Sequence, residues 1–261
     1  MATEEWPGKE DAGREPSDGY ADREMAALRA RIVGQLIAAV RGLPADSVPG
    51  ALCRSCLELL PTVSGLSVTV EDGAGSAVVL CASDDVAARI AELQYTLGEG
   101  PCGEAVRLRA PVFAADLTAA PDARRWPMFA SQAVTEGARA AFSIPLTGAF
   151  EALGTLDLYR DKPGRLDLDH VRTALLVADA FALVVNALGG ASQGGEGVVA
   201  WLKDAVSDRE EIHQATGMIM VRLGVSAEEA GLRLRALAFS QGRTSRDVAL
   251  DIVNRTLDVP S

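Results

Sequence analysis

The chain has 261 residues, 48% of them hydrophobic and 23% charged, so it can form one large domain or two smaller ones and is not disordered as a whole. It carries 36 acidic and 25 basic residues, and the net charge of −11 excludes indiscriminate binding to DNA or anionic lipid. Any contact with nucleic acid must therefore be local.

The chain begins with a stretch that has little to bury. Residues 1–24 contain eight acidic and three basic residues, a composition typical of a disordered acidic tail. Apolar residues return at helical spacing from Met25 to Val40, and Gly42 with Pro44 ends this predicted helix.

A mixed domain follows, because the hydrophobic period changes repeatedly between residues 49 and 188. Strands are predicted at residues 66–70, 77–81, 112–115, 140–145 and 154–159. Helices are predicted at residues 51–60, 86–93, 98–108 and 124–136, and a long apolar helix, capped by Asp167 or Asp169, runs to residue 188. Strands and helices do not alternate strictly, which favours the α+β class, an antiparallel sheet flanked by helices. With the N-terminal helix, this domain is expected to span residues 25–188.

A glycine-rich segment marks the clearest domain boundary. It holds five glycines between residues 189 and 197, the composition of a flexible linker, and we place this linker at residues 189–199. Residues 200–261 then form a second domain.

Three segments of the second domain share a helix-start signal, a hydroxyl residue followed three positions later by an acidic one. The hydroxyl oxygen accepts a hydrogen bond from an amide one turn on, and the acidic residue suits the positive end of the helix. The segments begin at Ser207, Ser226 and Thr244, and Gly224 and Gly242 stand where the first two helices should end. The sequence predicts a three-helix bundle with helices at residues 208–223, 227–241 and 245–257.

Nothing in the sequence indicates export or membrane insertion. The longest apolar stretch, residues 174–188, is shorter than the roughly 18–20 residues that span a bilayer, and it contains Asp179. The chain starts with acidic residues and lacks the basic start and apolar run of a signal peptide. Four cysteines without framework-like spacing do not suggest a disulfide scaffold and fit a reducing compartment. We therefore expect a cytoplasmic protein that makes no membrane contact.

Few residue patterns indicate chemistry. The two histidines, His170 and His213, fall in different domains, which argues against catalysis by histidine. Cys53 and Cys56 have the spacing of redox and zinc sites, but no second pair completes four zinc ligands, and both fall on the apolar side of a helix. We expect both to pack in the core, and neither a metal nor a cofactor is predicted.

Cys102 lies in a glycine-rich segment, residues 98–105. Pro101 suits the first position of a helix, which places Cys102 in the first turn near unpaired amides, where a thiol becomes more reactive. The pattern fits a packed cysteine at a tight turn, which we favour, and also a reactive or ligand-contacting one. The glycines match neither a phosphate loop nor a dinucleotide fingerprint.

The second domain is nearly neutral overall, yet its charges are sorted. Residues 230–246 contain four arginines and no acidic residue. Arginine suits phosphate and base contacts through its planar guanidinium group, so a nucleic acid would bind at this basic edge, with Arg222 at the end of the first helix. An ordinary solvated helix surface shows the same pattern.

Both domains resemble known families. Residues 212–220, Ile-His-Gln-Ala-Thr-Gly-Met-Ile-Met, together with residues 224–230 and 247–249, resemble the ANTAR domain, a three-helix RNA-binding module of transcription antiterminators. Residues 98–105, Gly-Glu-Gly-Pro-Cys-Gly-Glu-Ala, together with residues 125–127 and 143–146, look like the GAF sensor domains that are fused to ANTAR domains in actinobacterial regulators. The first resemblance covers about residues 207–253 and the second about residues 49–188.

The sequence departs from the ANTAR pattern at three positions. Thr216 stands where the family often has lysine, which removes a phosphate contact. Gly231 replaces a bulky apolar residue and Ser245 replaces a leucine, so we expect looser packing of the bundle.

The resemblance implies a non-enzymatic regulator whose GAF domain senses a small ligand or a redox state. Its ANTAR domain would bind RNA stem-loops in nascent transcripts and favour an antiterminator over a terminator hairpin. Two bound hairpins would require a homodimer. Together with the basic edge, the resemblance assigns the RNA contacts to Gln214, Arg222, Arg235, Arg243 and Arg246.

Two other classes of function fit the same sequence. The bundle can act as a helix-turn-helix in a DNA-binding or protein-interaction regulator. A thiol redox sensor based on Cys102 is the third hypothesis.

Overall fold

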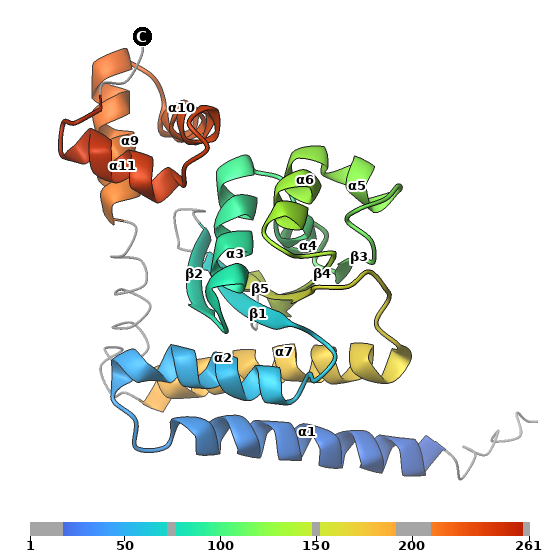
Figure 1. The fold of residues 1–261 in the computed structure, drawn as a ribbon. Coiled ribbons are helices and arrows are strands. Elements are labelled where there is room, and N and C mark those ends of the chain that lie inside the picture. The colour runs from blue at the N-terminus through green and yellow to red at the C-terminus, as the bar shows by residue number, and fades with distance from the viewer. Residues whose placement is uncertain (1–17, 72–76, 148–151, 192–209, 258–261) are drawn as a thin grey trace, which may run out of the picture.

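The computed structural model describes residues 18–71, 77–147, 152–191 and 210–257. Within these ranges the chain forms an α+β domain followed by a bundle of three helices (Figure 1).

A five-stranded antiparallel sheet forms the centre of the first domain, with the spatial order β2-β1-β5-β4-β3. The strands are β1 (Gly65–Glu71), β2 (Ala77–Ala82), β3 (Val112–Ala114), β4 (Ala140–Thr147) and β5 (Ala152–Arg160). The middle strand needs glycine at position 154, where φ is 145° and a side chain would overlap the backbone of Thr69. This sheet confirms the predicted α+β class.

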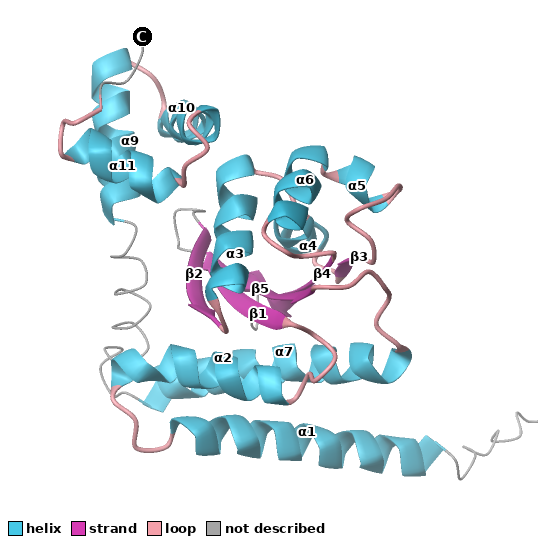
Figure 2. Cartoon of the chain, viewed as in Figure 1, coloured by secondary structure: helices cyan, strands magenta, loops and turns pink. Residues whose placement is uncertain are grey.

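Helices cover both faces of the sheet (Figure 2). One face is covered by α2 (Val48–Glu58) and α7 (Leu168–Ala191). Helix α1 (Asp18–Val40) packs against these two helices on the side away from the sheet, and a short 3-10 turn (Ala45–Ser47) joins it to α2 (Figure 2). The other face carries α3 (Asp85–Leu97), α4 (Pro101–Leu108), α5 (Asp122–Arg125) and α6 (Pro127–Thr135). Each face has its own apolar core, with Phe181 buried in the first and Phe129 in the second. The sheet is therefore buried on both sides.

Two helices of this domain differ from the prediction. Helix α1 begins at Asp18, so the last seven residues of the predicted acidic tail are helical, and acidic residues there suit the positive end of the helix. Residues 1–17 lie outside the described residues. The predicted helix at residues 124–136 is two helices, α5 and α6, because Pro127 has no amide hydrogen with which to continue the first.

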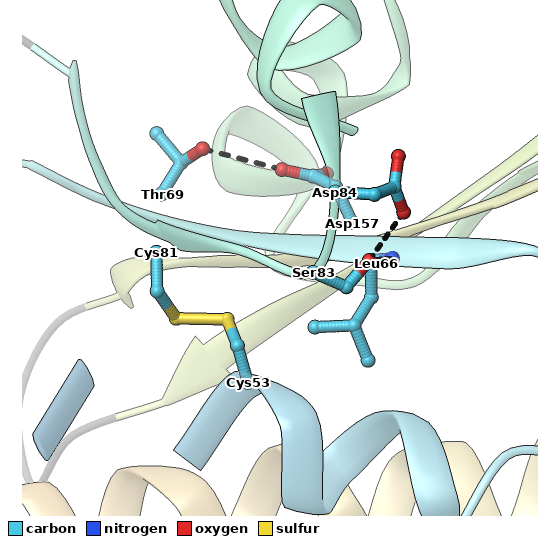
Figure 3. The surroundings of a disulfide bond; sticks show 7 residues. All are labelled: Cys53, Leu66, Thr69, Cys81, Ser83, Asp84 and Asp157. Atoms are coloured by element: carbon cyan, nitrogen blue, oxygen red, sulfur yellow. Dashed lines mark hydrogen bonds between the residues drawn. A yellow bond between two sulfur atoms is a disulfide. The ribbon is translucent and has the colours of Figure 1, made fainter. Parts of the chain in front are cut away.

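A disulfide joins Cys53 of α2 to Cys81 of β2, which corrects the expectation that the cysteines form no disulfide (Figure 3). The sequence did not reveal this pair because the two residues are 28 positions apart, and only the packing of α2 on the sheet brings their Cα atoms to 6.2 Å. Cys53 and Cys56 are both buried, as predicted. Cys56 is free, and burial raises the pKa of its thiol to about 12.

The second domain consists of α9 (Glu210–Leu223), α10 (Ala227–Ser240) and α11 (Ser245–Val253), around an apolar core of its own. The oxygens of Ser226 and Thr244 accept hydrogen bonds from backbone amides three residues on, at 3.2 and 3.1 Å, as the capping pattern predicts. Gly224 ends α9 in the left-handed region, with φ of 66°. The first predicted cap, Ser207, lies outside the described residues.

The linker prediction is tested only at its start. Helix α7 continues to Ala191, so the first three residues of the predicted linker are helical. Residues 192–199 lie outside the described residues, and the division into a tail, two domains and a linker stays a prediction.

Reduction of the Cys53–Cys81 disulfide is expected to lower the free energy of unfolding by about 3 kcal/mol, because the bond joins residues 28 positions apart in the unfolded chain. Urea unfolding with and without a reducing agent measures the difference. The effect of the reductant should be unchanged in Cys102→Ser, which alters a free cysteine. Four reactive thiols in the denatured, non-reduced protein would contradict the bond.

Candidate nucleic-acid interface and domain junction

The three-helix bundle rests on the C-terminal end of α3 (Figure 1). Thr96 of α3 and Ser245 at the start of α11 are both buried, and their hydroxyl oxygens lie 3.1 Å apart. The Ser245 amide also donates to the hydroxyl oxygen of Thr96, at 3.4 Å. Beside them, Tyr95 packs against the core of the bundle, and the guanidinium carbon of Arg235 lies 6.0 Å from the centre of the Tyr95 ring. These contacts determine which side of the bundle faces the α+β domain.

An open groove of about 680 Å³ lies between α9 and α11, and all of its lining residues among those that the structure describes belong to the bundle. Gln214 and Arg222, two of the predicted RNA contacts, line it together with Arg255. Between them lie Met218 and Val221, and Val221 is 89% exposed. Arg255 belongs to no sequence motif and was not predicted as an RNA contact, because only the folded bundle places it in the same groove as Arg222.

The other predicted RNA contacts lie elsewhere. Arg235 of α10 faces the α+β domain, and Arg243 lines a cavity at the same junction. Arg243 also forms an ion pair with Asp251, with 2.7 Å between nitrogen and oxygen. Arg246 is exposed in the first turn of α11. The arginines of the predicted basic edge therefore do not share one face. Asp251, which lies outside the acid-free segment 230–246, also neutralises the charge of Arg243.

The structure describes the surroundings of all three positions at which the sequence departs from the ANTAR pattern. The hydroxyl of Thr216 donates to a backbone oxygen one turn back, at 2.7 Å, so its side chain is bound to its own helix. Ser245 is fully buried against Thr96 of the α+β domain, and the looser packing of the bundle stays a prediction. Gly231 lies beside Arg235, and a side-chain carbon added at this glycine would lie 3.6 Å from a guanidinium nitrogen, an ordinary contact distance, so the structure does not require glycine here.

Cys102 lies in the first turn of α4, as predicted, with Pro101 at the start of the helix. Unpaired amides were expected near Cys102, but its own backbone amide is paired and donates to the side-chain oxygen of Gln94 at 2.8 Å. Its sulfur lies 3.1 Å from the hydroxyl of Thr155, which in turn donates to Asp157 at 2.8 Å. The half-buried, hydrogen-bonded thiol fits a packed cysteine, and its reactivity stays a prediction.

Asp157 places a carboxyl group in the buried centre of the sheet. The hydroxyls of Ser143, Thr155 and Thr69 donate to its oxygens, and Figure 3 shows the bond from Thr69. Burial disfavours the charged carboxylate more than these hydrogen bonds favour it, so the pKa of Asp157 is raised. The cavity beside it measures only about 10 Å³, which holds no more than one water molecule.

A much larger cavity, of about 500 Å³, lies where the two domains meet. Thr69 and Val79 of the sheet line it, together with residues of α3 and α4 that include Cys102. Arg235 lines the same cavity from the bundle. The cavity is therefore shared by both domains.

Among the residues that the structure describes, no cluster of three or more His, Cys, Asp or Glu side chains is placed to hold a metal ion. None of the described helices combines the length and the apolar character that crossing a bilayer requires. Of the two histidines, His170 pairs with Asp167 at 2.7 Å and His213 is exposed on α9.

Comparison with protein families identifies both domains. Residues 45–186 match the GAF domain, and residues 200–253 match the ANTAR domain. Because the GAF match covers more than half of the chain, the protein belongs to the GAF domain family, and it carries an ANTAR domain after the GAF domain. Both are regulatory domains, so the protein is a regulator with a sensor domain. A comparison with curated protein sequences finds no match.

Several solved structures resemble the first domain. The GAF domain of a phosphoenolpyruvate-protein phosphotransferase from Coxiella burnetii is 18% identical, with a TM-score of 0.47, and the match covers 62% of this chain and 95% of that one. A domain of a two-component sensor histidine kinase from Sinorhizobium meliloti is 19% identical, with a TM-score of 0.45 and coverage of 56% and 93%. The type II free methionine-R-sulfoxide reductase from Thermoplasma acidophilum is 20% identical, with a TM-score of 0.41 and coverage of 55% and 93%.

Replacement of Asp157 by Asn is expected to remove a pH-dependent loss of stability. Because folding raises the pKa of Asp157, its contribution to stability is fully present below the pKa of an unfolded aspartate and is lost as the pH rises through the folded value. The free energy of unfolding of the wild type should therefore fall relative to that of Asp157→Asn between about pH 4 and pH 7.

Urea unfolding at both pH values measures this change. Asp169→Asn makes the same substitution at a carboxylate that is 90% exposed and is the control for removing one carboxylate. A pH-independent difference between the wild type and Asp157→Asn would mean that Asp157 has no raised pKa.

The Thr96–Ser245 contact is expected to couple the two domains by about 1 kcal/mol, the usual net contribution of a buried hydrogen bond. A double-mutant cycle of Thr96→Ala and Ser245→Ala, measured by the stability of the bundle, gives this coupling. Ser240→Ala is the control partner, because Ser240 is exposed and bonds within its own helix. Additive effects of Thr96→Ala and Ser245→Ala would show that the domains do not meet at this contact in solution.

Proposed function

We propose that this protein is a signal-responsive transcription antitermination regulator that acts in the cytoplasm and catalyses no reaction. Its ANTAR domain binds RNA stem-loops in nascent transcripts, and its GAF domain senses a small ligand or a redox state. The observation that carries this proposal is the groove between α9 and α11. It brings Gln214, Arg222 and Arg255 together on a face that the GAF domain leaves open.

The groove suits the loop of an RNA hairpin. Loops expose unstacked bases, and the apolar surface at Met218 and Val221 offers such a base a place to pack. The guanidinium groups of Arg222 and Arg255 suit phosphates and base edges. Met218 and Val221 are both exposed and lie in the same groove, and exposed apolar side chains that gather in one place are typical of an interaction surface. Because the whole chain carries a net charge of −11, this local site must supply the affinity.

The remaining predicted contacts suggest how a signal reaches the RNA-binding domain. Arg246 is exposed and fits the same role, whereas Arg235 and Arg243 are engaged at the domain junction. We propose that a signal changes the exposure of the ANTAR domain, and with it the arginines available to RNA. A homodimer would hold two ANTAR domains close enough to bind two hairpins at a high effective concentration.

Arg222→Ala is expected to weaken the binding of the full chain to a labelled two-hairpin leader RNA. If Arg222 neutralises one phosphate, the slope of log affinity against log salt should become shallower by about 1. Binding measured at several salt concentrations gives both quantities. Arg172→Ala is the matched control, because it removes the same charge from an exposed ion pair with Asp169 on the GAF domain.

The other outcomes of this experiment separate the rival functions. A preference for matched duplex DNA over the hairpins would favour a helix-turn-helix regulator. Binding to neither nucleic acid would overturn the proposal and favour a protein partner. Fast and selective alkylation of Cys102 in the folded protein would support the redox sensor instead.

A further inference from the structure

The cavity at the domain junction has the size of a small-molecule site. Its volume of about 500 Å³ lies in the usual range for pockets that bind small organic ligands. The space beside Asp157, by contrast, is too small for any ligand larger than water. A small molecule therefore has room where the GAF and ANTAR domains meet and not at the centre of the sheet.

Both carboxylates that line this cavity already have partners. Glu104 forms a two-point ion pair with the guanidinium group of Arg125. Glu99 accepts hydrogen bonds from the backbone amides of Met128 and Phe129 at the start of α6, at 3.1 and 3.4 Å. Both carboxylates are therefore held by partners from their own domain, Glu104 by a guanidinium group and Glu99 by two backbone amides.

The two cations of the cavity are held more weakly. Arg107 lies 3.7 Å from Glu104, and its side chain is 69% exposed. Arg235 lies over the Tyr95 ring, and within the described ranges no carboxylate forms an ion pair with it. Its guanidinium group therefore lies at the cavity, and it can form a two-point hydrogen bond to an anion there.

Aromatic and apolar surface completes the lining. Tyr95 and Trp126 contribute rings, and Val79 and Ala91 contribute apolar surface. Such a lining suits a ligand with a planar or apolar body, while a few polar groups determine its orientation.

We infer from these contacts that the cavity binds a small organic anion, with its body against Tyr95 and Trp126 and its carboxylate or phosphate on the guanidinium group of Arg235. The inference names the ligand class of the sensing role proposed above, and it rests on that role. Because Arg235 belongs to the ANTAR domain, this ligand contacts both domains at once, and the site is incomplete without α10. Ligand binding and the position of the RNA-binding domain are then linked through one side chain.

The test uses the full chain without RNA and three fluorinated probes of similar size, followed by fluorine NMR titration. The probes are 4-fluorobenzoate, 4-fluorophenyl phosphate and the neutral 4-fluorobenzamide. At least one anion should bind more tightly than the amide, and the two anions distinguish a carboxylate site from a phosphate site. Arg235→Ala should weaken anion binding by about tenfold or more, the usual effect of removing a charge-assisted hydrogen bond, and leave the amide unaffected.

Two further variants separate the role of Arg235 from general effects. Arg233→Ala removes the same charge from the same helix at a residue that pairs with Glu229, 2.9 Å away, and does not line the cavity, so it should not change anion binding. Arg235→Lys keeps the charge without the planar guanidinium and should give an intermediate affinity.

The inference is overturned if no anion binds, if the anions bind no better than the amide, or if Arg235→Ala and Arg233→Ala have equal effects. The experiment contains no RNA. A protein that binds hairpins and no anion would therefore refute this site alone, and one that binds anions and no hairpin would refute the RNA-binding proposal alone.

Discussion

The buried contact between Thr96 and Ser245 joins the GAF domain to the ANTAR domain. A buried serine hydroxyl needs a hydrogen-bond partner, and among the described residues the hydroxyl of Thr96, 3.1 Å away, is placed to serve Ser245. The end of α3 supplies this partner, and it also brings Tyr95 to the core of the bundle. A position at which the ANTAR family usually has leucine thus becomes the point of attachment to the GAF domain.

That attachment decides which faces of the bundle remain open. With α10 turned toward α3, Arg235 is at the junction, whereas the described residues that line the groove between α9 and α11 all belong to the bundle. The proposed RNA site and the proposed anion site therefore occupy different sides of the same small bundle. Since helix positions three or four residues apart share a face, a bundle of three helices can present both surfaces at once.

The GAF sheet divides its two faces in a similar way. Successive residues of a strand point to opposite faces, so Asp157 lies toward α3 and α4 while Leu156 and Leu158 belong to the core under α2 and α7. Figure 3 shows the result, with the Cys53–Cys81 disulfide on one side of the sheet and the Thr69–Asp157 hydrogen bond on the other. The apolar face joins the sheet to its supporting helices, and the polar face supports the helices that line the junction cavity.

Much of this organisation follows from the sequence by itself. Capping residues such as Ser226 and Thr244, the alternation of apolar residues in the strands and the family motifs predicted the element types, the α+β class and both domains. These signals act over one helical turn or one pair of neighbouring residues, and so a linear sequence displays them. The tertiary structure alone decided the pairing of Cys53 with Cys81, the presence of Arg222 and Arg255 in one groove and the place of Arg235 at the junction. Thr96 and Ser245 are 149 positions apart, and a contact of that kind forms only when the packing of whole domains brings its two ends together.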